Sequence, residues 1–324
     1  MAHRSKPDTG GAEATNATTG ALLQDRALRA ALWAALRLPY ERRVPLFGAI
    51  AQKAASRLTS YHQRMLENLD YVWPDLSEAR RSEIAAAAGN NFGRALIEHF
   101  SMADLARRMD GVAPTGPGLQ TLQAAAEQGR PVVLVTGHFG NYEAARLCLI
   151  KQGWNVGALY RPMGNPYINR TYVDVAEKVG GGPLFPQGRQ GMGQLLRHLK
   201  NGGAAIILND LYVGGGVEMP FLGKPAMTGL SAAELALKLR APLIPFYGIR
   251  APDGLTFRVE VEPEIPASDA EAMTAAFNRS IEARIEAHPG QWFWIHRRWK
   301  RKWNGGKGMK PGLHPAALPR RKSS

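Results

Sequence analysis

The sequence contains one cysteine in 324 residues, Cys148, which excludes an internal disulfide and any cysteine-based metal cluster. It has no Walker phosphate-binding loop and no Rossmann glycine fingerprint, so nothing in it predicts a nucleotide cofactor. The first twenty residues carry charges and Pro7 in place of an apolar core. They predict a disordered leader over residues 1–20 and not a secretory signal.

Long apolar runs are also missing from the N-terminal part, where a membrane anchor would be sought. Uncharged stretches of segment 21–55 are short: Ala30–Leu36, for example, lies between Arg29 and Arg37, whereas a spanning helix needs roughly 20 apolar residues. Apolar residues of this segment nevertheless recur at helical spacing and alternate with arginines. Such a pattern belongs either to a helix lying flat on an anionic membrane or to an ordinary amphipathic helix packed on the domain; we expect segment 21–55 to face the membrane.

Acidic residues are scarce at the C-terminal end. The chain carries 41 Lys and Arg against 27 Asp and Glu, a net charge of +14, and ten of these cations follow Ala287 without an acidic residue. The core of this basic end is Arg297, Arg298, Lys300, Arg301 and Lys302. A basic end suits phospholipid headgroups, nucleic acid or an acidic protein, or serves only solubility, and we expect a flexible tail over 306–324.

Short apolar strands alternate with helices through the middle of the chain. The composition, 45% apolar and 21% charged, is globular, and no linker interrupts residues 21–305, so one domain is expected there. Buried strands are predicted over 131–136, 156–160, 204–209 and 243–249, and a period-two strand over 256–262. Helices are predicted over 77–109, 142–152, 165–179, 190–200, 231–239 and 269–287, with glycine loops at 180–183 and 214–216. This order predicts an α/β fold, a mostly parallel central sheet between helices with an antiparallel strand at one edge.

The residues that carry chemistry begin where the first predicted core strand ends. The stretch Thr-Gly-His-Phe-Gly-Asn-Tyr-Glu from Thr136 places His138 on a turn and Glu143 in the first turn of a helix. Ligands of open α/β sheets bind at the carboxyl ends of strands. A glutamate that accepts from one imidazole N–H leaves the other ring nitrogen as a base, so His138 and Glu143 are predicted to form a general-base dyad. The structural alternative is a capping histidine beside an acid that favours the helix dipole.

Further motifs follow in a fixed order. They are Tyr160-Arg161-Pro162, Asn209-Asp210, the Pro-Phe-Leu-Gly block within 219–228, and Gln-Trp-Phe-Trp-Ile-His-Arg-Arg-Trp over 291–299. Together with the His-x4-Glu block they make residues 21–303 resemble the late acyltransferases of lipid A biosynthesis, the lauroyl and myristoyl transferases of Kdo-lipid A, within the wider His-x4-Asp/Glu acyltransferase group. The sequence departs from that family in its arginine-interrupted N-terminal segment and in Leu211, where the family tends to have glutamine.

The resemblance implies the reaction and the roles of the site residues. The donor would be a fatty acyl thioester on acyl carrier protein, and the acceptor a hydroxyl on a 3-hydroxyacyl chain of a lipid A precursor, with no cofactor and no metal. His138 would take the proton of the hydroxyl and Glu143 would orient the imidazole. The candidates for contacting substrate are Arg161, Asp210 and Arg189, and those for stabilising the oxyanion are Arg161 and Gly140.

A lipid acceptor implies work at a membrane surface. We expect peripheral attachment to the cytoplasmic face of the bacterial inner membrane, through segment 21–55 and the basic end from Arg297. Acyl carrier protein is acidic and would be attracted to the same basic surface. Trp292, Phe293, Trp294 and Trp299 are compatible with an interfacial aromatic belt or with core packing; we expect Trp292 and Trp294 to share one face of a strand on the core.

Three other functions fit parts of the sequence. Actinobacterial mannoside acyltransferases share the His-x4-Glu and Pro-Phe-x-Gly blocks, so another membrane glycolipid or a lysophospholipid is the alternative acceptor. A metal-dependent hydrolase would use His138, Glu143, Asp210 and His296, but tightly spaced ligands such as His-Glu-x-x-His are absent. The basic charge suits a nucleic-acid-binding protein, yet no helix-turn-helix, zinc-finger or RNA-recognition signature is present, so no nucleic acid partner is expected.

Overall fold

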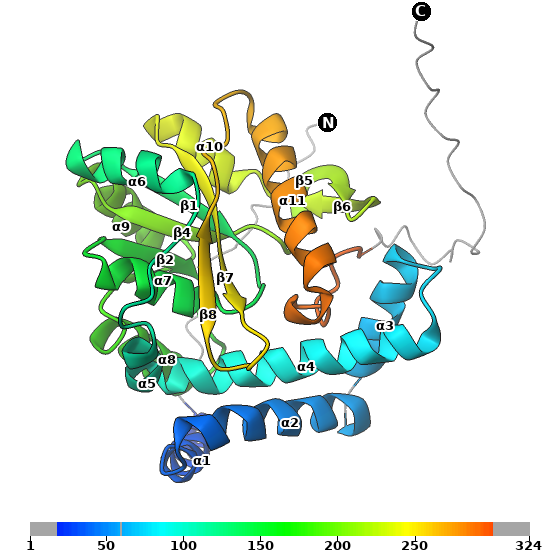
Figure 1. Ribbon diagram of the computed structural model, residues 1–324. Coiled ribbons are helices and arrows are strands. Elements are labelled where there is room, and N and C mark those ends of the chain that lie inside the picture. Colours follow the sequence, from blue (N-terminus) through cyan, green and yellow to red (C-terminus); the bar gives the residue numbers. More distant parts are fainter. Residues whose placement is uncertain (1–17, 59, 301–324) are drawn as a thin grey trace, which may run out of the picture.

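A six-stranded sheet forms the centre of the molecule (Figure 1). The computed structural model describes residues 18–58 and 60–300. The strands of the sheet, in spatial order, are β3 (Leu184–Pro186), β2 (Val156–Tyr160), β4 (Ala204–Leu208), β1 (Val132–Thr136), β7 (Leu243–Arg250) and β8 (Phe257–Val261). All neighbours pair parallel except β7 and β8, which pair antiparallel at the edge. The expected α/β architecture is confirmed, and β1 lies in the interior of the sheet, where its carboxyl end is flanked by β4 and β7.

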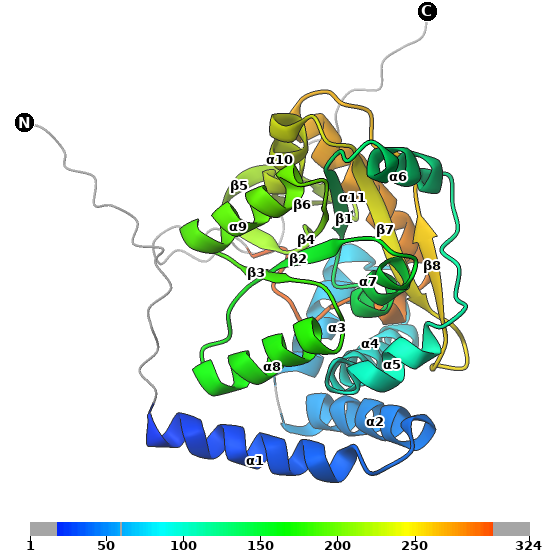
Figure 2. The ribbon, with the colours of Figure 1, turned by 90° about the vertical axis from the view of Figure 1, so that its left-hand side faces the viewer.

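Helices cover both faces of the sheet (Figure 2). They are α1 (Thr19–Ala35), α2 (Tyr40–Leu58), α3 (Tyr61–Val72), α4 (Glu78–Phe100), α5 (Met102–Arg108), α6 (Gly118–Glu127), α7 (Tyr142–Lys151), α8 (Pro166–Lys178), α9 (Arg189–Lys200), α10 (Ser231–Leu239) and α11 (Ala270–Ala287). Along β1, Val133 and Val135 join the apolar cluster that includes α9, α10 and α11, while Val132 and Leu134 join the cluster of α5, α6 and α7. Both faces of β1 are buried, which is why its sequence is a continuous apolar run.

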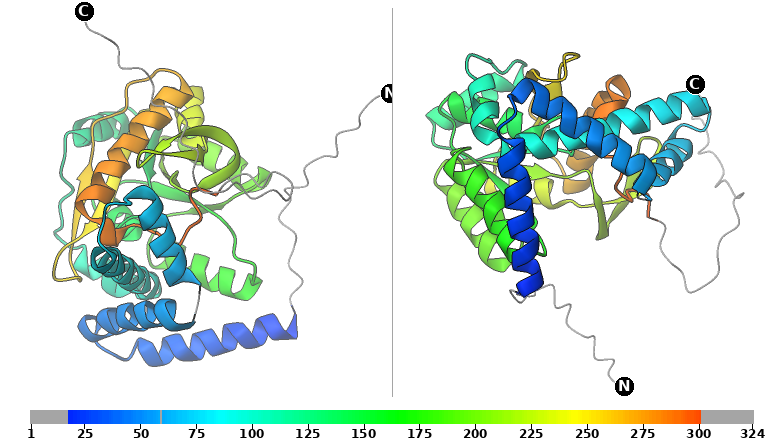
Figure 3. Two further views of the ribbon diagram at one scale, coloured as in Figure 1. Left: turned by 90° about the vertical axis from the view of Figure 1, so that its right-hand side faces the viewer. Right: turned by 90° about the horizontal axis from the view of Figure 1, so that it is seen from below.

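The N-terminal segment forms two helices at the base of the molecule in Figure 1. Seen from below, α1 and α2 diverge from their connecting turn, and α2 runs along α4 (Figure 3). Helix α1 meets α8, where Arg29 Nη2 donates to Thr171 Oγ1 at 2.7 Å. In the described ranges, no helix is long and apolar enough to cross a membrane. The expected leader 1–20 lies outside these ranges except for its last three residues, of which Thr18 caps α1, and the expected tail 306–324 lies wholly outside them.

Two local expectations are wrong, and one strand was missed. The helix predicted over 77–109 is two helices, because Ser101 leaves the helical conformation and separates α4 from α5. The glycines 214–216 are not a loop: they lie in β5 (Tyr212–Phe221), which pairs antiparallel with β6 (Lys224–Thr228) in a separate hairpin. The Pro-Phe-Leu-Gly block forms the turn of this hairpin. The short strand β3, which is three residues long, was not predicted.

Close packing of α2 on α4 depends on a glycine. A Cβ at Gly93 would lie 2.5 Å from the Phe47 carbonyl oxygen and 2.4 Å from the Ala51 Cβ, whereas a Cβ at Gly89 would meet nothing nearer than 3.5 Å. We expect Gly93→Ala to lower the free energy of unfolding by about 1–3 kcal/mol, because the helices must separate. Gly89→Ala is the matched control and should raise it, by up to roughly 1 kcal/mol, through helix propensity. Urea denaturation checks the pair, and equal effects at both positions would contradict this reason for Gly93.

Candidate active site

The turn between β1 and α7 builds the site. Gly140 adopts φ +56°, and a Cβ there would lie 2.0 Å from the Gly248 carbonyl oxygen, so the turn requires glycine. Asn141 caps α7 by accepting from the amides of Glu143 and Ala144 at 3.0 and 3.1 Å. Together these features place His138 at the carboxyl edge of the sheet, as predicted.

Asp210, not Glu143, contacts the His138 imidazole. His138 Nδ1 lies 2.8 Å from Asp210 Oδ1, and the His138 amide donates to Asp210 Oδ2 at 2.7 Å. Trp292 Nε1 donates to the same Oδ2 at 2.9 Å. A carboxylate only accepts, so in the neutral imidazole Nδ1 carries the proton and Nε2 is left with its lone pair. The His138 side chain keeps 31% of its surface exposed, which leaves the ring accessible to a substrate.

The surroundings of Asp210 favour its charged form. Full burial by itself raises the pKa of a carboxyl group. The attraction of His138 and the hydrogen bonds from His138 and Trp292 more than offset this, and the pKa of Asp210 is lowered from its usual value. Asp210 therefore presents a fixed negative charge to the imidazole at neutral pH.

Glu143 pairs with a different residue from the one expected. Its Oε2 accepts from Arg146 Nε at 2.9 Å, and both side chains are buried. Arg146 also donates to the carbonyl oxygens of Ala176 and Gly182, at 3.1 and 3.2 Å. Glu143 lies on the side of α7 that faces α8, whereas the His138 imidazole points toward Asp210 at the end of β4. The predicted His138–Glu143 hydrogen bond is therefore wrong. Glu143 instead holds Arg146, which ties α7 to the end of α8.

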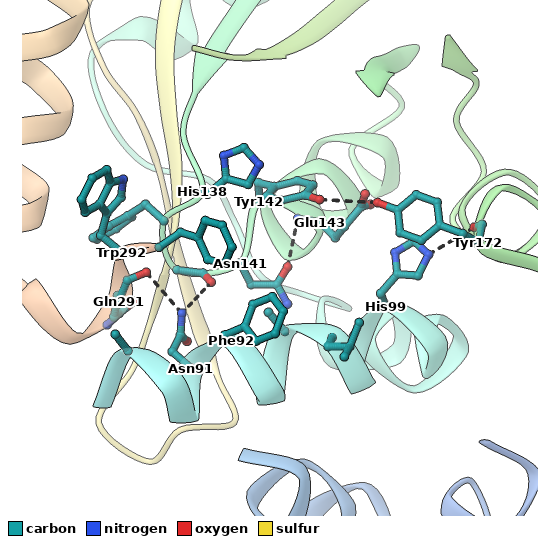
Figure 4. A pocket seen from close by; sticks show the side chains of 16 residues that line it. Asn91, Phe92, His99, His138, Asn141, Tyr142, Glu143, Tyr172, Gln291 and Trp292 are labelled. Carbon is teal, nitrogen blue, oxygen red and sulfur yellow. Dashed lines mark hydrogen bonds between the residues drawn. The ribbon is translucent and has the colours of Figure 1, made fainter. Parts of the chain in front are cut away.

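An apolar pocket opens beside His138 (Figure 4). Its walls come from α4, the β1–α7 turn, the start of α7, α8 and the segment after η1 (Pro289–Gln291). Helix α4 contributes Ala88, Phe92, Ala95, Leu96 and His99, whose spacing of three and four residues puts them on one face of the helix. Phe92 and Leu96 are 40% and 46% exposed, which places apolar side chains at the entrance. The sequence analysis missed this wall, although the spacing along α4 was there to be found.

Two tyrosines stand in the polar part of the pocket. The Tyr142 and Tyr172 hydroxyls are 3.5 Å apart, and burial, together with the Glu143 charge, raises the pKa of Tyr142 to about 12. Burial also raises the pKa of Tyr172. Both phenols are therefore neutral near pH 7. In Figure 4, Tyr142 and Glu143 lie between His138 and the pair His99–Tyr172.

Of the two expected oxyanion donors, one is already engaged. The Gly140 amide donates to the Gln291 carbonyl oxygen at 2.9 Å and is occupied. Within residues 18–58 and 60–300, no acceptor is found for the amide of Tyr142, the first residue of α7. Arg161 follows β2 and Arg189 begins α9; both are exposed, and neither lines the pocket.

Part of the C-terminal motif is buried in the core. Trp292 and Trp294 are 1% and 0% exposed, as expected, although neither lies on a regular strand: Trp292 forms an isolated β-bridge with Phe139, and Trp294 lies in a turn. Arg298, expected in a solvated basic end, is 0% exposed. Its Nη1 donates to the Met227 carbonyl oxygen at 2.6 Å and its Nη2 to Thr228 Oγ1 at 2.6 Å. The guanidinium donors of Arg298 thus have acceptors at the end of β6, and these hydrogen bonds offset the cost of removing the charge from water.

The hydrolase alternative finds no support in the geometry. In the part of the chain that the structure describes, no three His, Cys, Asp or Glu side chains gather in a way that could hold a metal ion. Asp210 is engaged by His138 and Trp292.

Cys148 is placed as a core residue. It is buried on α7, its thiol donates to the Val112 carbonyl oxygen at 3.2 Å, and burial raises its pKa to about 11. A thiol with so high a pKa is a poor nucleophile near pH 7. We expect Cys148→Ser to leave activity within about twofold, because serine keeps the hydrogen bond. Loss of activity in a folded variant, or on treatment of the native enzyme with a thiol reagent, would contradict this.

Comparison with known proteins agrees with the sequence motifs. The family model described as bacterial lipid A biosynthesis acyltransferase matches residues 22–301. The chain is 27% identical over 281 residues to the lipid A biosynthesis lauroyltransferase of Escherichia coli, covering 83% of this chain and 89% of that protein. It is 25% identical over 269 residues to a lipid A biosynthesis acyltransferase of Haemophilus influenzae, covering 80% and 81%. It is also 26% identical over 246 residues to a phosphatidylinositol mannoside acyltransferase of Mycobacterium tuberculosis, covering 73% and 77%.

Proposed function

Because the chain belongs to the bacterial lipid A biosynthesis acyltransferase family, we propose that it moves a fatty acyl chain from acyl carrier protein to a hydroxyl group of a lipid A precursor. One observation carries the proposal: the His138 imidazole, held by Asp210 through Nδ1, stands at the edge of an apolar pocket. A base beside an apolar channel suits an alcohol that attacks the carbonyl of a fatty acyl thioester.

The reaction follows from these placements. His138 Nε2 takes the hydroxyl proton as the acceptor oxygen forms its bond to the thioester carbonyl carbon, and Asp210 stabilises the resulting imidazolium. The tetrahedral intermediate then collapses, the carbon–sulfur bond breaks, and the proton held by His138 neutralises the thiolate. The products are an ester and the free carrier thiol. No covalent bond to the protein forms, so Cys148 has no part in it.

We propose two donors for the oxyanion, a backbone amide and an arginine side chain. The Tyr142 amide stands at the start of α7, where the helix dipole favours negative charge. Arg161 follows β2 at the same edge of the sheet, and its exposed side chain is a second donor. Arg189, at the start of α9, is our candidate for a phosphate group of either substrate.

Glu143 acts in this scheme as a positioning residue. It holds Arg146, which binds the carbonyl oxygens at the end of α8, and α8 carries the Tyr172 wall of the pocket. The His-x4-Glu block would then combine a base with a residue that shapes the acyl pocket.

The test is turnover by the purified protein. Acyl carrier protein loaded with fatty chains of different lengths is mixed with a lipid A precursor or with a phosphatidylinositol mannoside, and the products are weighed by mass spectrometry. We expect one acyl group to be added to the lipid A precursor. The mannoside is a real second candidate, because the Mycobacterium tuberculosis relative is named for it. Failure to acylate the lipid A precursor with any chain length would overturn the proposal.

We also propose peripheral attachment to the cytoplasmic face of the inner membrane through α1 and α2. Apolar side chains of these helices are exposed: Leu23 59%, Trp33 61%, Leu46 44% and Ile50 51%. The Arg37 guanidinium lies 3.6 Å from the Trp33 ring centroid, which joins a cation to the exposed aromatic ring. Apolar rings among arginines suit the headgroup region of an anionic bilayer. An acidic acyl carrier protein would meet the same positive surface.

Membrane binding should therefore be weak enough for salt to reverse. Each cation near an anionic surface contributes about 1 kcal/mol, and salt screens that attraction over about 8 Å at physiological ionic strength. We expect high salt or alkaline carbonate to release the protein from membranes, and Trp33→Glu to reduce vesicle binding. Val213→Glu is the matched control, because Val213 is 44% exposed but lies in the β5–β6 hairpin. Attachment through α1 and α2 would be contradicted if only detergent released the protein from membranes, or if Trp33→Glu and Val213→Glu reduced vesicle binding equally.

A further inference from the structure

His99 has a fixed tautomer. Its ring stacks on Tyr172 with centroids 3.8 Å apart and planes 9° apart, and its Nε2 lies 3.1 Å from the Tyr172 carbonyl oxygen. A carbonyl oxygen only accepts hydrogen bonds, so Nε2 must carry the proton. Burial lowers the pKa of His99, which keeps the ring neutral. The other nitrogen, Nδ1, is therefore an acceptor.

Among residues 18–58 and 60–300, no donor serves that acceptor. His99 is 5% exposed and its Nδ1 is buried without a hydrogen-bond partner. The Asn141 amide group donates to Glu98, and the Asn91 amide group donates to the Gly140 and Gln291 carbonyl oxygens. Glu143, on the side of the ring opposite its bond to Tyr172 in Figure 4, is itself an acceptor. A buried acceptor left unmatched lowers stability, so such an atom in a ligand pocket points to a donor on the ligand.

We propose that His99 Nδ1 accepts a hydrogen bond from a hydroxyl group on the fatty chain that occupies this pocket. The hydroxyl is distinct from the reacting one, which is held at His138. The pocket as a whole is mainly apolar, with Phe92, Ala95 and Leu96 on the same helix as His99, while His99 stands beside Tyr172 in its polar part. The chemistry that fits is a hydrocarbon chain with one polar donor. The proposal rests on the proposed acyltransferase function and names the class of chain that the pocket takes.

The first experiment compares acyl donors of equal length with and without a chain hydroxyl. We expect wild-type kcat/KM to favour a hydroxylated donor about tenfold, the value of one buried hydrogen bond. His99→Phe keeps an aromatic ring against Tyr172 but has no acceptor, and should abolish the preference. His99→Gln offers one donor and one acceptor and should restore it. Leu96→Ala is the control: it alters the apolar wall and should lower both rates together.

A second arm separates the two sources of the hydroxyl. If donors show no preference, acceptors with and without a hydroxyl on a non-reacting chain are compared in the same variants. A preference in the acceptor arm that His99→Phe abolishes assigns the hydroxyl to the acceptor. Equal rates in both arms, with turnover intact, overturn the hydroxyl proposal and leave the acyltransferase function standing. Absence of turnover with every pair overturns the function itself.

A spectroscopic readout covers the case in which His99→Phe does not fold. In wild-type protein labelled with 15N-histidine, the His99 Nδ1 resonance should shift when a hydroxylated fatty acid binds and should stay in place with the unhydroxylated acid of equal length. Identical shifts with the two acids would overturn the proposal.

Discussion

Replacing His138 with alanine is expected to lower turnover by roughly 10²–10⁴-fold, because the attacking hydroxyl loses its base. Asp210→Asn should lower turnover by nearly the same factor. Oδ1 of the asparagine would accept from the His138 amide and Trp292, so its NH2 group would face His138 Nδ1. That forces the imidazole proton onto Nε2 and removes the base. The double variant should cost little more than His138→Ala alone, since the residues act as a unit.

The control for this experiment is Glu143→Gln. Because Glu143 bonds to Arg146 and not to His138, its replacement should change KM and thermal stability more than the pH dependence of kcat. Asp210→Asn should change the pH dependence. Circular dichroism and melting curves establish that each variant is folded. A folded Asp210→Asn enzyme with near-native turnover, or a Glu143→Gln enzyme with the altered pH profile, would reverse the assignment of the imidazole's partner.

The largest effect on stability is expected at Glu98. Both of its oxygens accept from Arg250 at 2.6 Å, and they also accept from the Tyr40 hydroxyl at 3.1 Å and the Asn141 amide group at 2.8 Å. Its side chain is 0% exposed, so Glu98→Ala leaves the Arg250 charge buried without its partner. We expect a loss of about 3–5 kcal/mol in the free energy of unfolding.

Glu83→Ala is the matched control for Glu98. The Arg80–Glu83 pair lies on the same helix, but its side chains are 49% and 66% exposed, and its loss should cost no more than about 1 kcal/mol. Because Glu98 also holds Asn141, which caps α7 beside His138, a partly folded Glu98 variant should lose activity as well. Urea denaturation of both variants checks the prediction. Similar losses at the two sites would contradict it.

Local pattern determined much of the fold. The strand predicted over 156–160 and the helix predicted over 231–239 match β2 and α10 to the residue. Both could be predicted because the spacing of apolar residues differs between a buried strand and a helix. The alternation after residue 256 gave the antiparallel edge strand β8. The placement of His138 on the turn after β1 also followed from the sequence, since the end of an apolar run marks the edge of the sheet.

Only the tertiary structure decided which distant residues contact one another in the site. Asp210 contacts His138, 72 residues earlier in the chain, because β1 and β4 are parallel neighbours in the sheet. The sequence of neither strand indicates which strand lies beside it. The sequence suggests a surface charge for Arg298, yet it is buried against the end of β6, where the Met227 carbonyl oxygen and Thr228 Oγ1 accept its hydrogen bonds. The apolar pocket joins α4, α7 and α8. The Nδ1 atom of His99 is an unmatched acceptor because Nε2 donates to the Tyr172 carbonyl oxygen of α8, a contact that only the packing of α4 and α8 creates. Local spacing selects helix or strand through interactions a few residues apart, whereas the contacts that make the site depend on how distant elements pack, and no local pattern encodes that packing.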